Sequence, residues 1–172
     1  ALDYFQKCLE IKDEMGDKKG VATSYGNIGA IYDTQGNYEK ALEYQQKSLE
    51  IKDEIGDKKG ISISYINIGN IYRSQGNFER SLEYYEKSLV ISVEIGDKRG
   101  IGNSYNNIGI IYREQGNYEK ALEYYEKSLE MKDEIGNKKD IASAYGNIGV
   151  INYFQGNYKK ALDYFQKCLE IK

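Results

Sequence analysis

The chain has 172 residues, of which 24 are basic and 27 are acidic, so its formal net charge at neutral pH is −3. Acidic and basic residues are interspersed, so no sustained field of one sign exists to attract nucleic acid or an anionic membrane. Histidine, the commonest general base and metal ligand, is absent, and no apolar run reaches the roughly 18 residues of a membrane span. We therefore expect no nucleic-acid partner and no membrane partner.

The sequence repeats itself every 40 residues, and residues 1–12 are identical to residues 161–172. A fixed period of this length is typical of a solenoid, in which each unit buries its apolar face only against its neighbours. We predict an all-α solenoid of nine helices in one array over residues 1–172. It would consist of a lone B helix at 1–16 and A–B helix pairs at 17–56, 57–96, 97–136 and 137–172.

The opening B helix, residues 1–16, has no A helix before it, which leaves the apolar stripe of Leu2, Phe5, Cys8 and Leu9 without one partner. The final B helix presents a similar face. Solenoids usually need polar terminal caps, and neither end resembles one. We expect a fragment of a longer array, with head-to-tail contact between copies at high concentration, because the two ends are equivalent.

The pair at 57–96 illustrates one unit. Asp57 is a typical N-cap for a first helix that ends before Gly76, and apolar residues spaced by three and four give this helix one buried face. Gly76 suits the left-handed conformation that closes a helix, and Asn77 can cap a second helix that runs to Ile95. Glu and Lys four residues apart on the B helices predict ion pairs at Glu43/Lys47, Glu83/Lys87, Glu123/Lys127 and Asp163/Lys167.

Small residues recur where helices must approach closely. A glycine inside a helix costs roughly 1 kcal/mol relative to alanine, so four in register indicate close A–B packing; they are Gly29, Gly69, Gly109 and Gly149. A second slot holds Cys8, Ser48, Ser88, Ser128 and Cys168, which predicts a small packing position and no disulfide framework. Asn152 replaces the tyrosine of the earlier units, so we expect looser A–B packing there.

These residues resemble the tetratricopeptide repeat, whose motif places an aromatic, Leu-Gly and Tyr on helix A and small, aromatic and small residues on helix B. Tyr65, Ile68, Gly69 and Tyr72 match the first set, and Ser81, Tyr85 and Ser88 match the second. The resemblance covers the whole chain. The 40-residue length is similar to repeats of kinesin light chains, cell-polarity scaffolds and bacterial regulatory proteins. It implies a right-handed superhelix whose concave groove is lined by A helices.

The resemblance also implies which A-helix positions touch a ligand, and these positions vary far more between the copies than the capping, glycine and stripe positions do. A groove that reads a ligand would vary in this way, and drift at exposed positions is the alternative. Several variants are large and apolar, which favours an interaction site. The candidate groove residues are Asn27, Ile63, Ile66, Asn67, Asn70, Arg73, Asn103, Asn106, Asn107, Ile110, Arg113, Asn147, Val150, Tyr153 and Phe154.

One groove position is constant: Asn27, Asn67, Asn107 and Asn147. In the family this asparagine often hydrogen-bonds the backbone of a bound peptide, while a bridge between adjacent A helices is an equal alternative. The expected ligand is a protein segment with apolar side chains, extended or helical, and an acidic residue near Arg73 and Arg113 is plausible. Chaperone-binding relatives clamp a terminal carboxylate with lysines in the first two groove slots, where this chain has none, so we reject that activity.

The sequence contains no motif for catalysis, and we expect no catalytic residue, metal site or cofactor. The glycines follow neither a phosphate-loop nor a calcium-loop pattern, and the lysine pairs at each unit start are flanked by acidic residues, as in a solvated loop. Two functions remain: a protein–protein interaction scaffold, or a structural spacer that assembles end to end without a specific groove ligand. In either case we expect a reducing, cytoplasmic setting.

Overall fold

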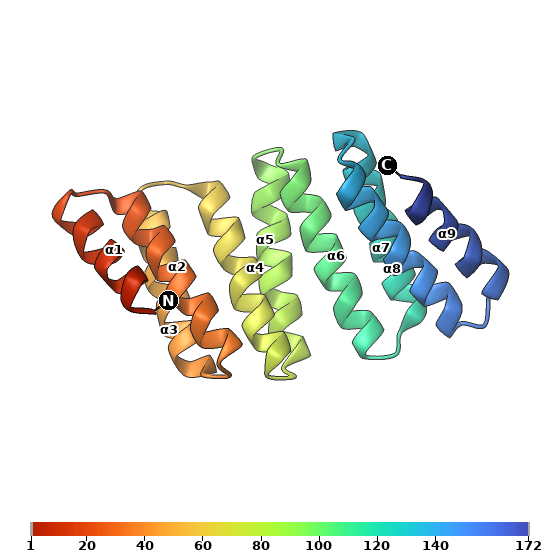
Figure 1. The fold of residues 1–172 in the computed structure, drawn as a ribbon, viewed down its shortest axis with the longest axis horizontal. Helices are drawn as coiled ribbons and strands as arrows, with labels where there is room; N and C mark the ends of the chain where they lie inside the picture. The colour runs from red at the N-terminus through yellow and green to blue at the C-terminus, as the bar shows by residue number, and fades with distance from the viewer. Residues whose placement is uncertain (1, 172) are drawn as a thin grey trace. The chain divides into compact units, whose positions relative to one another are not determined.

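The computed structural model describes the backbone of residues 2–171 and the side chains of residue 7 and residues 9–171. Over this range the chain forms nine α-helices joined by short turns and no strand (Figure 1). The predicted all-α repeat of helix pairs is therefore confirmed. The helices are α1 (Leu2–Glu14), α2 (Lys18–Thr34), α3 (Tyr38–Glu54), α4 (Lys58–Ser74), α5 (Phe78–Glu94), α6 (Lys98–Glu114), α7 (Tyr118–Ile135), α8 (Lys138–Phe154) and α9 (Tyr158–Glu170).

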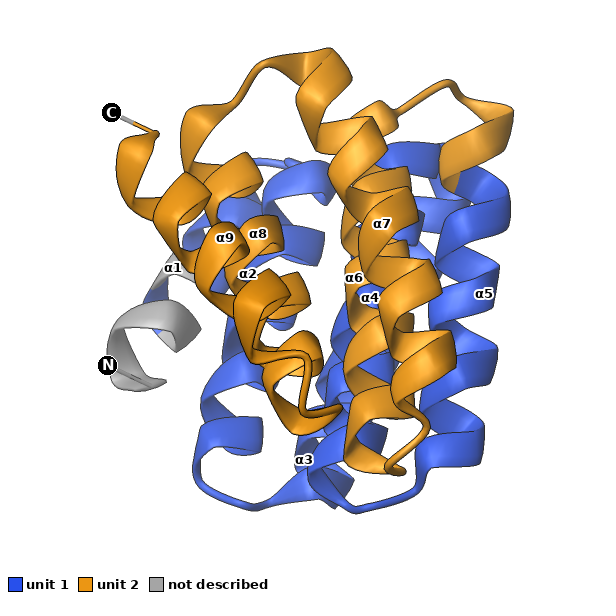
Figure 2. Ribbon diagram, turned by 90° about the vertical axis from the view of Figure 1, so that its right-hand side faces the viewer, with its two compact units in different colours: residues 1–91 blue, residues 92–172 orange. Residues whose placement is uncertain are grey.

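The chain divides into two compact units, Ala1–Ile91 and Ser92–Lys172 (Figure 2). In unit 1, α2 packs against α1 and α3, α3 packs against α4, and α2 also contacts α4. In unit 2, α6 packs against α7, α7 against α8, and α8 against α9. The A helices that could form a binding groove are therefore α2 and α4 in unit 1, and α6 and α8 in unit 2.

The predicted helix ends are confirmed in the pair formed by α4 and α5. The Asp57 carboxylate accepts a hydrogen bond from the Gly60 backbone N–H at 2.9 Å, which caps the start of α4. Gly76 has a φ of 74°, the left-handed conformation that residues other than glycine adopt with strain. The Asn77 side chain then accepts from the Arg80 N–H at 3.1 Å and caps α5.

Close contact between the A and B helices explains the glycines in register. A Cβ atom built on Gly69 would lie 2.6 Å from the Tyr85 ring, and one built on Gly109 would lie 2.8 Å from the Tyr125 ring. Both rings are fully buried. In the first pair Gln45 takes the place of the ring, so a Cβ on Gly29 would lie 3.0 Å from its amide nitrogen.

The serine slot is a packing position, as predicted. Ser48 and Ser128 are fully buried and donate hydrogen bonds to the carbonyls of Ala22 and Gly102, at 2.7 and 2.8 Å. Cys168, in the same slot of α9, is only half-buried. The Leu2, Phe5 and Cys8 part of the predicted opening stripe lies outside the described side chains, and Leu9 is half-buried.

The outward face of the B helices carries three of the predicted ion pairs. Lys47, Lys87 and Lys127 each lie 2.6 Å from the glutamate four residues before them. The fourth pair, Asp163 with Lys167, is not among the ion pairs of the described residues. Asp163 is one methylene shorter than glutamate, whereas the contact of the lysine with the tyrosine ring is kept: the Lys167 ammonium lies 5.0 Å from the centre of the Tyr164 ring, as Lys127 does from Tyr124.

Aromatic rings stack between A and B helices in the first three pairs. Tyr112 on α6 stacks on Tyr124 on α7 with ring centres 5.5 Å apart, and the two earlier pairs have the same arrangement. In the last pair the buried Asn152 side chain donates to the Ile148 carbonyl at 2.9 Å instead. None of the described helices has the length and apolar character needed to cross a membrane.

Candidate functional site

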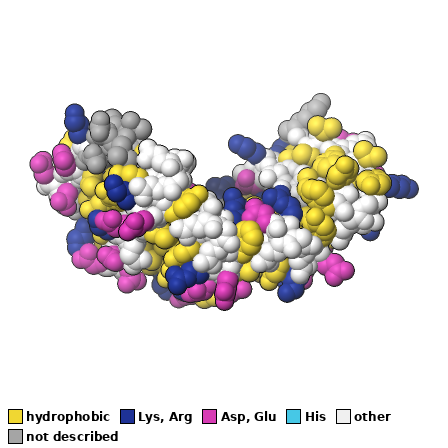
Figure 3. Space-filling model, turned by 90° about the horizontal axis from the view of Figure 1, so that it is seen from below, with side chains coloured by type: hydrophobic (Ala, Val, Ile, Leu, Met, Phe, Trp, Pro, Cys, Tyr) yellow, Lys and Arg dark blue, Asp and Glu magenta, His cyan; other side chains and the backbone are white. Residues whose placement is uncertain are grey.

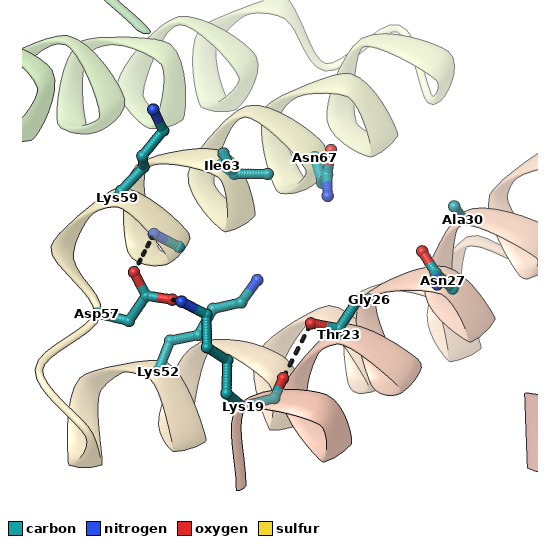
Figure 4. A pocket seen from close by; sticks show the side chains of 11 residues that line it. Lys19, Thr23, Gly26, Asn27, Ala30, Lys52, Asp57, Lys59, Ile63 and Asn67 are labelled. Atoms are coloured by element: carbon teal, nitrogen blue, oxygen red, sulfur yellow. Dashed lines mark hydrogen bonds and ion pairs between the residues drawn. The ribbon is translucent and has the colours of Figure 1, made fainter. Parts of the chain in front are cut away.

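Unit 1 contains an open pocket of about 500 Å³ between α2, the end of α3 and the start of α4 (Figure 4). Three of its lining residues, Gly26, Ala30 and Gly60, have a small side chain or none, and the space that larger side chains would fill is open. The remaining lining residues are polar, charged or aliphatic: Lys19, Thr23, Asn27, Lys52, Asp57, Lys59, Ile63 and Asn67. Three predicted groove residues, Asn27, Ile63 and Asn67, are thus brought together in one pocket.

The floor of this pocket carries a buried cation. Lys52 is only 8% exposed, and its ammonium donates a hydrogen bond to the Ser64 hydroxyl at 2.8 Å. Burial lowers the pKa of Lys52, and the charge of Asp57 opposes part of this shift. Asp57 lies 3.8 Å from the Lys19 ammonium. The pocket therefore combines lysines from two A helices and one B helix with a single carboxylate.

The constant asparagines differ in their surroundings. Asn27 is exposed, whereas the half-buried Asn67 donates to the Gln45 side chain at 3.5 Å. Gln45 in turn donates to the Gly26 carbonyl at 2.9 Å, so it ties α2, α3 and α4 together. Asn67 is thus linked to the neighbouring A helix only through Gln45 of the B helix between them, and the Asn27 side chain is exposed.

The predicted groove residues Asn70 and Arg73 lie near the end of α4, outside the lining of this pocket. The Asn70 side-chain oxygen Oδ1 accepts a hydrogen bond from the Tyr85 hydroxyl at 2.7 Å, so this atom already takes part in packing between α4 and α5. The positive charge of Arg73 interacts with the carboxylate of Asp33, a residue of the same chain. Burial raises the pKa of Asp33, while a hydrogen bond from Ser74 and the charge of Arg73 oppose this shift. Ile66 is half-buried on the same helix.

In unit 2 a side-chain hydrogen bond joins the two A helices, so the surface between them is more closed than in unit 1. The Asn147 amide on α8 donates to the Asn106 side chain on α6 at 2.8 Å. Asn103 is exposed, and Asn107, Ile110 and Val150 are half-buried. Arg113 lies 4.0 Å from the neighbouring Glu114 carboxylate. The bridge between Asn106 and Asn147 thus occupies the place where unit 1 is open.

An exposed aromatic cluster lies at the end of α8. Tyr153 and Phe154 are 56% and 54% exposed, and their rings make an edge contact with centres 5.9 Å apart. Phe154 also stacks on Tyr118 at 5.5 Å, and Tyr153 contacts Tyr158 at 5.7 Å. These two predicted groove residues therefore form part of a larger aromatic surface.

Sequence reasoning missed the lysines of the unit 1 pocket. Lys19 and Lys59 were assigned to a solvated loop, yet both follow the cap residue in the first turn of an A helix and line the pocket. Lys52 was overlooked, although Lys12, Lys52 and Lys132 recur at the repeat spacing on the B helices. The signal available in the sequence was the recurrence of lysine at one position of the repeat.

The repeated pairs of helices define an α-helical repeat scaffold. Models of the tetratricopeptide repeat match residues 1–54, 60–134 and 142–172, and the chain belongs to this family. The family consists of repeat scaffolds for protein interaction, and in these general terms the chain is such a scaffold. No curated protein sequence matches the chain. Among the described residues, no group of three or more potential metal ligands is present.

Solved structures share the fold at low sequence identity. BtubC (BKLC) from P. vanneervenii superposes with a TM-score of 0.88 at 20% identity, over 99% of this chain and 72% of BtubC. A Rap protein in complex with competence and sporulation factor gives 0.87 at 16% identity, over 98% of this chain and 47% of Rap. A signal transduction ATPase from Pyrococcus horikoshii with a tetratricopeptide repeat sensor gives 0.79 at 28% identity, over 95% of this chain and 26% of the ATPase.

Proposed function

We propose that the chain binds a segment of a partner protein on the A-helix faces of its two units. The observation that carries this proposal is the contrast between positions within the repeat. Stripe and glycine positions are buried and nearly constant, whereas the variable A-helix positions are exposed or half-buried, as for Ile63 at 47% exposure. Large apolar side chains at exposed variable positions favour binding over drift.

The chemistry of the two faces indicates the kind of segment. Ile63 and Ile66 in unit 1, and Ile110 and Val150 in unit 2, offer apolar contact to side chains of the segment. Asn27 and Asn107 can both donate to and accept from its backbone. The Rap protein, which has the same fold, forms a complex with competence and sporulation factor, and this supports the use of such a fold for ligand capture. We place this activity in the cytoplasm.

The test is a quantitative pull-down from lysate of the source cells. The groove variant carries Ile66→Asp, Asn107→Ala and Arg113→Glu. The control variant carries the same charge change on exposed positions away from the A-helix faces, with Val90→Asp, Gln46→Ala and Lys159→Glu. Proteins retained by the parent and the control but lost by the groove variant would support the proposal. Identical profiles for all three, at equal helicity, would refute it.

A second candidate function is head-to-tail assembly, which one observation favours. Leu162 and Leu169 on α9 are 67% and 81% exposed, and Tyr158 is 62% exposed. Figure 3 shows hydrophobic side chains gathered at the end of the molecule that α8 and α9 occupy in Figure 1. Sedimentation velocity over a hundredfold range of concentration would detect such assembly. A Leu162→Glu, Leu169→Glu variant should stay monomeric, and concentration-independent sedimentation of the parent would exclude assembly.

A further inference from the structure

The aromatic cluster of unit 2 departs from the repeat. Tyr153 and Phe154 occupy two slots that hold polar or charged residues at the end of each earlier A helix, namely Asp33 and Thr34, Arg73 and Ser74, and Arg113 and Glu114. The side chains of Tyr153, Phe154 and Tyr158 are each more than half exposed, so burial does not account for them. A contiguous group of exposed rings indicates an interaction surface.

Elsewhere in the chain, tyrosine rings between A and B helices are covered by cations of the chain itself. The Lys40 ammonium lies 5.2 Å from the centre of the Tyr32 ring, and every helix pair has at least one contact of this kind. Within the part of the chain that the structure describes, no lysine or arginine covers a ring of the aromatic cluster. Because ring faces attract cations, this cluster is open to a cation from another molecule.

A pocket with an unpaired carboxylate lies beside the cluster. It has a volume of about 530 Å³, is open, and lies between the α6–α7 turn and the α8–α9 turn, at the lower edge of unit 2 in Figure 1. Its lining residues are Gln115, Gly116, Asn117, Tyr118, Glu119 and Gln155. Glu119 is exposed and forms no ion pair with another described residue. The lining therefore offers one carboxylate and no cation.

We infer that the aromatic cluster and this pocket together bind an arginine side chain of the partner segment. The inference rests on the proposed function and adds one side chain to its ligand. Glu119 follows Tyr118, whose ring stacks on Phe154 with centres 5.5 Å apart. A planar guanidinium can stack on the exposed Phe154 ring while the N–H groups at its edge donate to the Glu119 carboxylate. A lysine ammonium is compact and strongly hydrated, so it suits this surface less well.

Most cations near the two turns have contacts of their own. Arg113 lies 4.0 Å from the carboxylate of the next residue, and the Lys120 ammonium lies 5.0 Å from the centre of the Tyr112 ring. Lys160 lines a different pocket, which also contains two carboxylates. Lys159 is exposed at the start of α9, and its charge opposes a bound cation through water. Lys159→Gln should therefore tighten arginine binding.

The probe is N-acetyl-L-arginine N-methylamide, titrated into the isotope-labelled chain and followed by NMR. We expect a dissociation constant in the millimolar range, with saturable shifts of the Phe154 ring, the Gly116 backbone amide and the Gln115 and Gln155 side-chain amides. The citrulline derivative, which has the same shape without the charge, should leave these signals unshifted. Equal shifts with citrulline, stronger shifts with the lysine derivative, or no saturable shift up to about 0.1 M would each overturn the inference.

Variants taken from the chain's own repeats provide matched controls. Phe154→Ser gives α8 the residue that α4 has in this slot and should abolish binding, whereas Phe154→Tyr should keep it. Glu119→Gln should weaken binding about threefold, as expected for an exposed ion pair. Glu79→Gln, the same loss of charge in the same slot of unit 1, should change nothing. Wild-type binding by Phe154→Ser at equal helicity would sink the idea.

The proposed function and the arginine subsite fail in different ways, because the groove variant of the pull-down changes no residue of the aromatic cluster. If the pull-down depends on the groove but the arginine derivative causes no shifts, a partner binds and the arginine subsite is wrong. If the derivative binds at the cluster but no protein depends on the groove residues, the arginine subsite stands and the proposed function is wrong.

Discussion

Asp33 carries a negative charge whose burial reduces the stability of the folded chain. One of its carboxylate oxygens is buried and has no hydrogen-bond partner among the described residues. Burial raises the pKa of Asp33 above its ordinary value, despite the hydrogen bond from Ser74 and the positive charge of Arg73. The folded state therefore binds the proton more tightly than the unfolded chain does. Ionised Asp33 thus destabilises the fold at neutral pH.

Replacing this carboxylate with its neutral isostere should stabilise unit 1 in a pH-dependent way. We expect Asp33→Asn to raise the thermal midpoint at pH 7, where the wild-type side chain is charged in both states. The gain should shrink as the pH falls through the raised pKa and vanish below the ordinary value of 3.8. Thermal unfolding followed by circular dichroism at several pH values measures this. A gain that grows on acidification would contradict the assignment.

At the scale of the helix, two glycines of neighbouring A helices should respond oppositely to alanine. Alanine gains about 1 kcal/mol of helix propensity over glycine at either position. At Gly109 the added methyl would overlap the buried Tyr125 ring, at 2.8 Å, so overpacking should leave Gly109→Ala destabilised by about 1–3 kcal/mol.

Gly146 supplies the matched control, because a Cβ there meets nothing within 4 Å. Gly146→Ala should therefore stabilise the protein by up to about 1 kcal/mol. Urea unfolding gives both free energies. If both substitutions stabilise, helix contact is not the reason for the glycines in register.

The last helix pair lacks the stacked tyrosines of the others, and this defect can be repaired. An open pocket of about 260 Å³ is lined in part by Asn152 and Tyr164. Asn152→Tyr should fill part of it and restore the stack, stabilising the protein by about 0.5–1.5 kcal/mol in urea unfolding. The reverse change in the third pair, Tyr112→Asn, should cost at least as much. A destabilised Asn152→Tyr would mean that this pair has packed around its asparagine.

At the scale of the whole molecule, the repeat made the fold predictable. Comparing copies within one sequence separates positions that build the scaffold from positions free to vary. Asp57, Gly69 and Gly76 could each be assigned a structural role, because cap, close contact and turn recur at fixed spacing. The family resemblance implied that Ile63 and Asn67 are groove positions, and both line the unit 1 pocket.

The pocket itself could not be predicted in this way, because it depends on one residue that departs from the repeat and on the burial of one that does not. Gln45 replaces an aromatic residue, so a side-chain amide lies beneath Gly26 and holds Asn67. Lys52 reads as one more charged residue of a polar helix until its burial is known. Only coordinates reveal that Gln45 contacts Gly26 and that Lys52 lines the same pocket as Gly26.

The main helix contacts within each unit join helices that are neighbours, or next neighbours, along the chain. Loops between contacting residues are therefore short, and proteins with such local contacts fold quickly. The sequence also contains no proline, so the unfolded chain has no X–Pro bonds to isomerise over about 10–100 s. Refolding after rapid dilution from urea should lack a phase on that timescale and be insensitive to a prolyl isomerase. We therefore expect each helix pair to fold during synthesis, soon after it has left the ribosome.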